Sequence, residues 1–179
     1  MKNTLTLLAA VSTFAFTANT NAADYTPYVA ADYTYSDIQN LAEVNGGKVA
    51  IGTEYNKYFG TEVFYQRTGS DRVHSADGTN EYSLQSYGLD VYGYLPLGCD
   101  QVVSLVGTAG IANMDVIYKD VDKKRDTENG LGYRLGAGVE YDINSNVSVR
   151  ALYRYTFTDK LLDGLDHVNE YSLGVKYAF

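Results

Sequence analysis

Residues 169–179, the last eleven of the chain, read NEYSLGVKYAF and decide the fold. Apolar or aromatic residues recur at every second position of this stretch, from Tyr171 to Phe179. Small or polar residues such as Gly174 and Lys176 occupy the positions between them. Because successive side chains of a strand point to opposite faces, this alternation predicts a strand with one apolar face and one polar or small face.

The same two-residue period recurs seven times earlier in the chain. The connections between the strands alternate strictly between long and short, and both ends of the predicted barrel domain fall on the side of the short connections. This pattern predicts an all-β fold, an eight-stranded antiparallel up-and-down transmembrane β-barrel. The earlier strands are expected at about 28–35, 48–55, 61–68, 83–95, 102–112, 130–141 and 147–157, and the long connections at 36–47, 69–81, 115–129 and 158–168.

An alternating barrel can place its apolar face inside, as soluble lipocalins do, or outside against lipid, and three features of the residues favour lipid. The rows that carry charges also carry many of the glycines, and a narrow lumen has little room for side chains. The chain has 18 Tyr and no Trp, so the Gly-x-Trp signature of lipocalins is missing. Aromatic residues gather at both ends of the apolar rows, as a bilayer requires. They are Tyr55, Tyr141, Tyr177 and Phe179 near the short turns, and Tyr33, Tyr35, Tyr65, Tyr87, Tyr133, Tyr155 and Phe157 near the long connections.

The first residues have the features of a secretory signal peptide. Lys2 supplies a positive charge, residues 4–17 an apolar core, and residues 20–23 small side chains for cleavage. We therefore expect a signal peptide at 1–22 and one barrel domain at 23–179. Cleavage after Ala22 removes Lys2 and no acid, so the net charge changes from −8 to −9. Such a charge disfavours nucleic-acid binding, which needs clustered Lys and Arg.

A terminal strand of alternating aromatic and aliphatic residues that ends in Phe resembles the closing strand of bacterial outer-membrane β-barrels. The whole pattern resembles the small OmpA/OmpX-type barrels and the opacity and attachment-invasion surface proteins. The resemblance implies the outer membrane of a Gram-negative cell, with outer-membrane lipid and lipopolysaccharide around a monomer. It also implies that the barrel-assembly machinery reads the last strand, so Tyr177 and Phe179 are expected to form an assembly signal. A ligand on a host or another cell would bind through the loops.

Charged residues on the predicted inward rows are expected to pair across the lumen, because unpaired charges are costly in a partly dry interior. We expect Glu54 and Glu62 opposite Arg150 and Arg154, with Arg134 and Glu140 alongside. Two interpretations remain open for this network: a plug that fills the barrel, or a gate that controls a narrow conductance, as is thought for OmpA-type proteins. The inward rows carry Asp32, Lys48, Glu54, Glu62, Asp90, Arg134, Glu140, Arg150, Arg154 and Lys176.

Other polar residues carry weaker signals. His74 and Ser75, and His167 beside Asp166, are nominal parts of a Ser–His–acid arrangement, but we interpret them as solvated loop residues. Residues 120–128 space their acids like a calcium loop, yet place Lys and Arg where a ligand and Gly are needed. Cys99 has no partner for a disulfide. We therefore predict no catalytic residue, no cofactor and no metal.

The sequence thus predicts an envelope-structural or surface-interaction protein. A narrow gated channel for small solutes is the alternative. A barrel enzyme that modifies lipid A is the third hypothesis.

Overall fold

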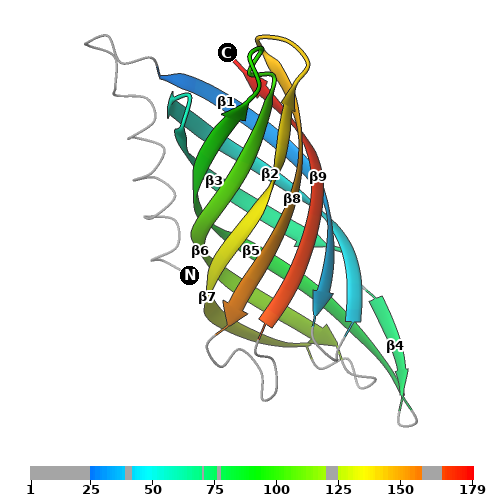
Figure 1. The fold of residues 1–179 in the computed structure, drawn as a ribbon. Coiled ribbons are helices and arrows are strands. Elements are labelled where there is room, and N and C mark those ends of the chain that lie inside the picture. Colours follow the sequence, from blue (N-terminus) through cyan, green and yellow to red (C-terminus); the bar gives the residue numbers. More distant parts are fainter. Residues whose placement is uncertain (1–24, 39–41, 70, 76–77, 120–124, 159–166) are drawn as a thin grey trace.

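A computed structural model describes residues 25–38, 42–69, 71–75, 78–119, 125–158 and 167–179, and these residues are almost entirely β-strand (Figure 1). None of them belongs to a helix that is long and apolar enough to cross a membrane. The predicted signal peptide lies outside the described residues. The strands are β1 (Thr26–Ile38), β2 (Ala42–Asn56), β3 (Phe59–Thr68), β4 (Asp71–Ser75), β5 (Gly78–Leu97), β6 (Val103–Lys119), β7 (Arg125–Asp142), β8 (Val147–Thr158) and β9 (His167–Ala178).

Eight of the described strands close into a barrel, which confirms the predicted fold class. Consecutive barrel strands pair antiparallel, and β9 returns to pair with β1 over the register from Tyr28↔Ala178 to Ile38↔Val168. The ninth strand, β4, pairs with β5 alone of the barrel strands, in the register Asp71↔Tyr82 to Ser75↔Gly78. It extends a hairpin beyond the barrel wall, while β3 and β5 pair directly and complete the wall.

The two ends of the barrel differ. One end, called here the turn end, carries the short β2–β3, β5–β6 and β7–β8 connections together with the start of β1 and the end of β9. The opposite end, called the loop end, carries the β1–β2, β3–β4–β5, β6–β7 and β8–β9 connections (Figure 1). All connections expected to be long therefore lie together at the loop end.

The strands at the loop end are longer than the sequence predicts. Much of the expected loops at 36–47, 69–81 and 115–129 is strand: β1 and β2 pair out to Ile38↔Ala42, and β6 and β7 out to Lys119↔Arg125. The predicted bounds were wrong here because period-two alternation needs a contrast between the two faces. Beyond the lipid both faces of a strand meet water, and the contrast disappears.

The side chains are distributed in the opposite way to those of a soluble protein. The largest fully buried side chains include Arg150, Arg154 and Lys48, whereas Leu173, Ile51 and other aliphatic residues are exposed on the outside. Leu173 is 65% exposed and Arg154 0%. Charged residues are almost never fully buried in soluble domains unless they are paired. The lipocalin-like alternative, with its apolar face inside, is therefore wrong.

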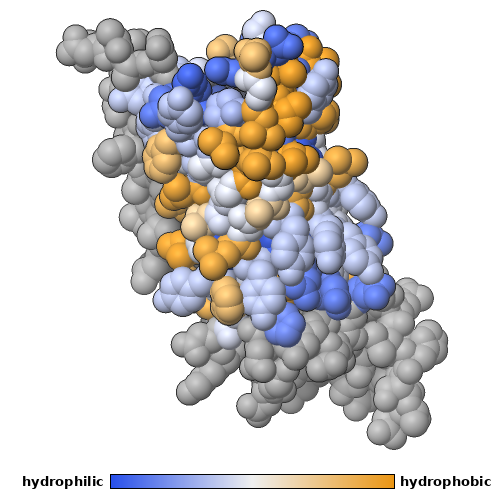
Figure 2. Space-filling model, viewed as in Figure 1, coloured by the Kyte–Doolittle hydropathy of each residue, from blue (hydrophilic) through white to orange (hydrophobic). Residues whose placement is uncertain are grey.

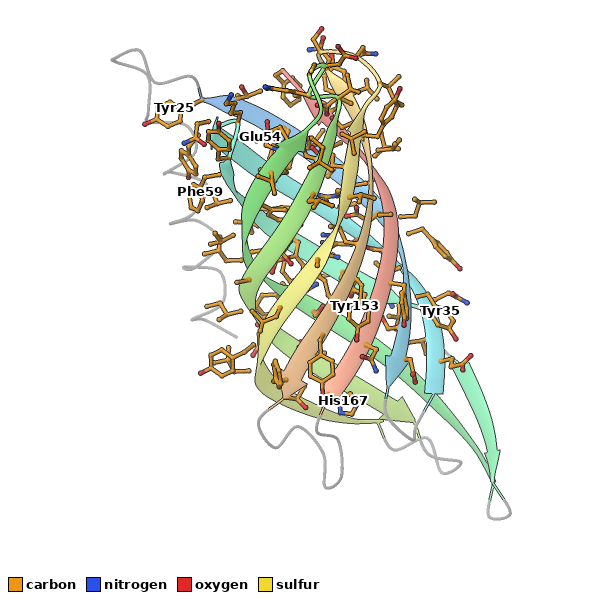
Figure 3. The ribbon with its side chains drawn as sticks, viewed as in Figure 1. Tyr25, Tyr35, Glu54, Phe59, Tyr153 and His167 are labelled. Carbon is orange, nitrogen blue, oxygen red and sulfur yellow. The ribbon has the colours of Figure 1, made fainter. Side chains whose placement is uncertain are left out.

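The outer face of the barrel has an apolar band bordered by aromatic residues. Figure 2 shows apolar residues over much of this face, with paler residues gathered towards the loop end. At the turn end Tyr55 contacts Tyr25 and Phe59, with ring centroids 5.6 and 5.7 Å apart. At the loop end Tyr171 contacts Tyr153, with centroids 5.1 Å apart. In Figure 3, Tyr25 and Phe59 lie at the turn end, whereas Tyr153 and Tyr35 lie further along the barrel towards the loop end, as expected for two membrane interfaces.

Candidate functional site

The middle of the lumen is organised around Arg150 of β8. Its Nε and Nη2 atoms donate to the two carboxylate oxygens of Asp32, at 2.7 and 2.8 Å, and its Nη1 atom donates to Glu62 Oε2 at 2.6 Å. Lys48 Nζ bridges the same two acids, 3.1 Å from Asp32 Oδ2 and 2.9 Å from Glu62 Oε1. Bidentate contact to a carboxylate fixes the guanidinium plane as well as its position. These four charged side chains, which we call the central cluster, join β1, β2, β3 and β8 across the lumen.

A second group lies nearer the loop end, around Glu170 of β9. Glu170 accepts hydrogen bonds from Arg154 Nη1 at 2.9 Å, Arg134 Nη2 at 3.3 Å and Gln66 Nε2 at 2.7 Å. Asp90 of β5 forms ion pairs with the same two arginines at longer distances, 3.9 Å to Arg134 and 3.8 Å to Arg154. We call Asp90, Arg134, Arg154 and Glu170 the upper cluster; it lies on the loop-end side of the central cluster, which is the lower side in Figure 1.

A third group lies nearer the turn end, where Lys176 of β9 donates to both Glu54 and Glu140. The ammonium group also lies 5.3 Å from the ring centroids of Tyr28 and Tyr94. Lys176 therefore has two carboxylates and two aromatic faces as neighbours, which compensates for the loss of water around its charge.

Two buried tyrosines connect these groups. Tyr92 donates from its hydroxyl to Glu62 Oε1 at 3.0 Å and accepts from Arg154 Nη2 at 2.9 Å, so it links the upper and central clusters. Tyr28 donates to Glu62 Oε2 at 3.2 Å. The ionic network therefore continues along the lumen, with aromatic rings filling the space between its charged groups.

An apolar layer covers the network at the loop end. It comprises Val44, Leu84, Met114 and Val168, which point inwards from β2, β5, β6 and β9 and are 2–3% exposed. All four belong to one cluster of buried apolar residues. Buried hydroxyl side chains lie between these four: Ser36 is the register partner of Val44, and Thr156 is that of Val168.

Glycines give the charged side chains their room. A Cβ atom at Gly174 would lie 1.9 Å from Asp32 Oδ1, and one at Gly138 would lie 2.1 Å from the backbone oxygen of Ala151. Glycine is thus required at these positions because neighbouring atoms already occupy the place of a Cβ atom. This agrees with the sequence argument about a narrow lumen.

The structure brings the six predicted network residues into the lumen, but only one predicted pair across it is formed as expected. Glu62 meets Arg150, whereas Glu54 and Glu140 meet Lys176. The pairing of Glu54 with an arginine was therefore wrong. The stagger of the strands explains the difference. Because barrel strands are tilted, the residue that faces a given side chain across the lumen is not the one at the same distance from the strand end.

Several members of the network were not among the predicted site residues, although alternation places them inside. Glu170 precedes the outward Tyr171, so its inward direction follows from the period of β9. Asp32, Lys48, Asp90 and Lys176 were placed on the inward rows, yet they were not assigned to the network. Gln66 carries no charge, so no sequence signal marks it as a partner of Glu170.

The two residues predicted as an assembly signal lie at the turn end. Tyr177 and Phe179 are 46% and 70% exposed on the outer face, and their rings meet edge to face with centroids 5.3 Å apart. The backbone N–H of Phe179 donates to the oxygen of Pro27 at 3.0 Å, which ties the last residue to the first strand.

Of the residues considered for catalysis, His167 is the one whose side-chain contacts the structure describes, and Asp166 lies outside the described residues. His167 is the first residue of β9 rather than a loop residue, and its ring stacks on Tyr155 with centroids 4.9 Å apart. His74 and Ser75 belong to β4. No group of three potential ligands that could hold a metal ion occurs in the described ranges, and part of the 120–128 segment lies outside them. Cys99 is exposed at the turn end.

Comparisons with known proteins agree with this geometry. Residues 6–179 match the family model of the outer membrane protein beta-barrel domain. A 22 kDa outer membrane protein of Rhizobium leguminosarum bv. viciae is 32% identical over 119 residues, which are 62% of this chain and 51% of that protein. The chain thus spans about half the length of this curated relative.

Solved structures share the fold at low sequence identity. Neisserial surface protein A has a TM-score of 0.64 and 18% identity, and the match covers 87% of this chain and 97% of that one. The attachment invasion locus protein Ail of Yersinia pestis has a TM-score of 0.59 and 15% identity over the same shares. The outer membrane enzyme PagL has a TM-score of 0.50 and 14% identity, with 84% and 98% covered. The fold alone therefore does not separate surface proteins from enzymes.

Proposed function

This chain belongs to the outer membrane protein beta-barrel family, and on that premise we propose that it is a non-catalytic surface-interaction protein of the Gram-negative outer membrane. The barrel is its rigid base in lipid and lipopolysaccharide, where it acts as a monomer. The strands that extend past the loop end present the binding surface. The partner is a ligand on a host cell or on another bacterium.

The extension of β5, β6 and β7 beyond the apolar band carries this proposal. On β6 the outward row changes from the apolar Ile111 to Asn113 and Asp115, yet the strand continues to Lys119 and stays paired with both neighbours. From Asn113 to Lys119 a strand covers roughly 20 Å of its own length, which at the usual tilt of barrel strands is roughly 15 Å along the barrel axis. A barrel that served only as a membrane plug would not need an ordered sheet at that height.

The lumen gives less support to the channel alternative. A conducting barrel needs a continuous wet path, whereas the central cluster spans the lumen with direct hydrogen bonds and the apolar layer follows it. The filled lumen favours the plug interpretation of the ionic network over the gate. The contacts of His167 with an aromatic ring likewise favour an interface residue over a catalytic one.

The proposal is tested by removing the extension without changing the barrel wall. In one variant, residues 116–128 are replaced by Asn-Gly, which joins the paired residues Asp115 and Asn129 through a two-residue hairpin turn. In the matched control, residues 98–102 at the turn end are replaced by Asn-Gly between the paired Leu97 and Val103. Bacteria that display each protein at equal surface amounts are tested for retention on cultured epithelial cells and for aggregation with sibling cells.

We expect the wild type and the turn-end control to bind above an empty-vector strain in at least one assay. The variant without 116–128 should fall to the vector level, because it has lost the extended parts of β6 and β7. Equal binding by this variant and the wild type, or no binding by the wild type in either assay, would contradict the proposal.

A further inference from the structure

Arg67 of β3 lies on the outer face of the barrel, where the apolar band ends near the loop end. Its side chain is exposed and has no hydrogen bond or ion pair with another described residue. The next outward residues towards the membrane are Tyr65 and its register partner Val49, which is 58% exposed. Among the Lys and Arg side chains that the structure describes, Arg67 is the exposed one at this border. It therefore presents an uncompensated positive charge at the depth of the lipid headgroups.

Asn45 of β2 supplies further hydrogen-bond donors beside Arg67. Tyr33 donates from its hydroxyl to Asn45 Oδ1 at 2.7 Å, so the amide oxygen is engaged and the two N–H groups of Nδ2 remain available to a ligand. The backbone N–H of Gly69 donates to the oxygen of Asn45 at 2.7 Å, and Arg67 pairs with Gly47. Asn45 and Arg67 are thus diagonal neighbours on adjacent strands, roughly 7–8 Å apart and within reach of a common ligand.

A glycine lies between the two sides of this group. Gly47 is the register partner of both Tyr33 and Arg67, and it faces outward. A Cβ atom at Gly47 would have one neighbour within 4 Å among the described residues, the backbone oxygen of Asp32 at 3.9 Å. Unlike Gly174 on the inward row, Gly47 is not required by close approach. The absent side chain instead leaves open space between Tyr33 and Arg67 on the outer face.

The described carboxylates of the outer face lie beside this group and not within it. Glu43 of β2 is hydrogen-bonded to the hydroxyl of Tyr35. Asp115 of β6 is the register partner of Gln85, which is in turn the register partner of Arg67. Asp115 is therefore two strand spacings, roughly 10 Å, away from Arg67. Gln85, between them, adds another amide, so the group combines one positive charge with neutral donors.

We propose that Arg67, Asn45 and the open position at Gly47 form a binding site for the phosphate group of an outer-leaflet lipid. The planar guanidinium donates to two phosphate oxygens, a pairing that fits its geometry. Asn45 Nδ2 donates to a third oxygen, and the phosphate lies over Gly47. The acyl chains continue along the apolar outer wall, which begins at Val49.

Charge and depth together identify this ligand. A cation would be repelled by Arg67, and a neutral sugar would leave its charge without a partner. At the border of the apolar band, phosphate is the anion that the membrane itself supplies. The inference rests on the outer-membrane placement proposed above and not on the surface-interaction role.

Lipid titration in a maltoside detergent, which carries no phosphate, tests this site. The refolded barrel is titrated with lipid A that carries its phosphate groups and with the same lipid A after enzymatic dephosphorylation. Native mass spectrometry measures the fraction of barrel with bound lipid. We expect the wild type to bind the phosphorylated form at least about tenfold more tightly, because hydrogen bonds between charged groups are among the strongest in proteins.

A pair of glycine variants distinguishes the site from a merely exposed arginine. Gly47→Val fills the open position without a close contact at its Cβ atom, and the preference for phosphorylated lipid should be lost. Gly107→Val is the matched control and should keep the preference. Gly107 also faces outward, with no described atom within 4 Å of a Cβ atom, but it lies inside the apolar band. Arg67→Met should abolish the preference, and Asn45→Ala should reduce it severalfold.

Equal binding of the two lipids by the wild type would overturn the proposal. A preference that Gly47→Val retains would overturn it too, because an arginine alone would then suffice. Inorganic phosphate is added as a competitor at the lipid concentration, and displacement of the lipid would assign the site to free phosphate instead. Gel mobility of unheated samples confirms that each variant is folded. If Gly47→Val does not fold, an unchanged preference in Asn45→Ala rejects the site.

The assay contains no cells, so its failure leaves the surface-interaction role unaffected. Conversely, loss of cell binding without residues 116–128 says nothing against the phosphate site, because all of its residues lie on β2 and β3.

Discussion

Individual charged residues in this protein take the place that aliphatic residues hold in a soluble core. Arg150 is 1% exposed and has a direct hydrogen bond or ion pair to each of two carboxylates from different strands. The burial of one such charge is tolerable only because its partners are in contact. Removing one partner from a buried ion pair typically destabilises a protein by about 3–5 kcal/mol, since the remaining charge stays buried.

Arg150→Met should therefore lower the stability of the barrel by roughly 3–5 kcal/mol, because Asp32 and Glu62 would face each other with only Lys48 between them. The measurement is urea unfolding in detergent, followed by the gel mobility of unheated samples. Arg67→Met, on the exposed outer face, is the control and should change stability by less than about 0.5 kcal/mol.

A quadruple variant separates charge from packing. Asp32→Asn, Glu62→Gln and Lys48→Met, combined with Arg150→Met, remove all four charges of the central cluster. Part of the lost stability should return, since replacing all members of a buried ionic group is milder than removing one. A quadruple variant less stable than Arg150→Met would show that shape, and not charge balance, determines the central cluster.

Among the elements, β9 is the last strand of the chain and closes the barrel by pairing with the first. It pairs with β8 on one side and with β1 on the other, and its inward residues include Glu170 and Lys176. Its outward residues contribute differently. Phe179 is 70% exposed, so its ring adds little to the lumen, while its backbone bond to Pro27 would survive a change of side chain.

Phe179→Ala should consequently reduce the amount of protein in the outer membrane severalfold while leaving the stability of the refolded barrel nearly unchanged. The first quantity is measured by cell fractionation and the second by urea unfolding in detergent. Leu173→Ala, a lipid-facing change on the same strand, is the control for simple loss of apolar surface. Equal membrane amounts for Phe179→Ala and the wild type would contradict an assembly signal at the last residue.

At the scale of the whole molecule, the barrel is a closed wall around a filled lumen. The central cluster, the upper cluster and the apolar layer follow one another along the lumen, so no single ion pair separates its two ends. This arrangement suits a rigid support for the extended strands better than a pore.

Planar bilayer recordings test this view of the lumen. We expect the wild-type protein to be silent, and Glu54→Ala to be silent as well, because that change opens only the group of charges nearest the turn end. A known porin in the same bilayer provides the positive control. Steady single-channel currents for the wild type, or their appearance in Glu54→Ala, would support the gate interpretation instead.

The sequence by itself determined the class of the protein, its strand count and the direction of nearly every side chain in the membrane-spanning part. The reason is that lipid and lumen are very different environments, and period-two alternation records that difference residue by residue. From this alternation, Arg134, Glu140 and Arg154 were placed inside, and Leu173 and Tyr177 outside, before any contact was known.

Only the tertiary structure decided which charges meet and where the strands end. Lys176 pairs with Glu54 and Glu140 because the tilt and stagger of the closed barrel bring them together across large distances in the chain. The extension of β5, β6 and β7 could not be predicted from the sequence. Both faces of those segments lie beyond the lipid, so no contrast between apolar and polar faces marks them as strand. Alternation reports the solvent on each face, whereas partners and strand ends depend on how the sheet closes.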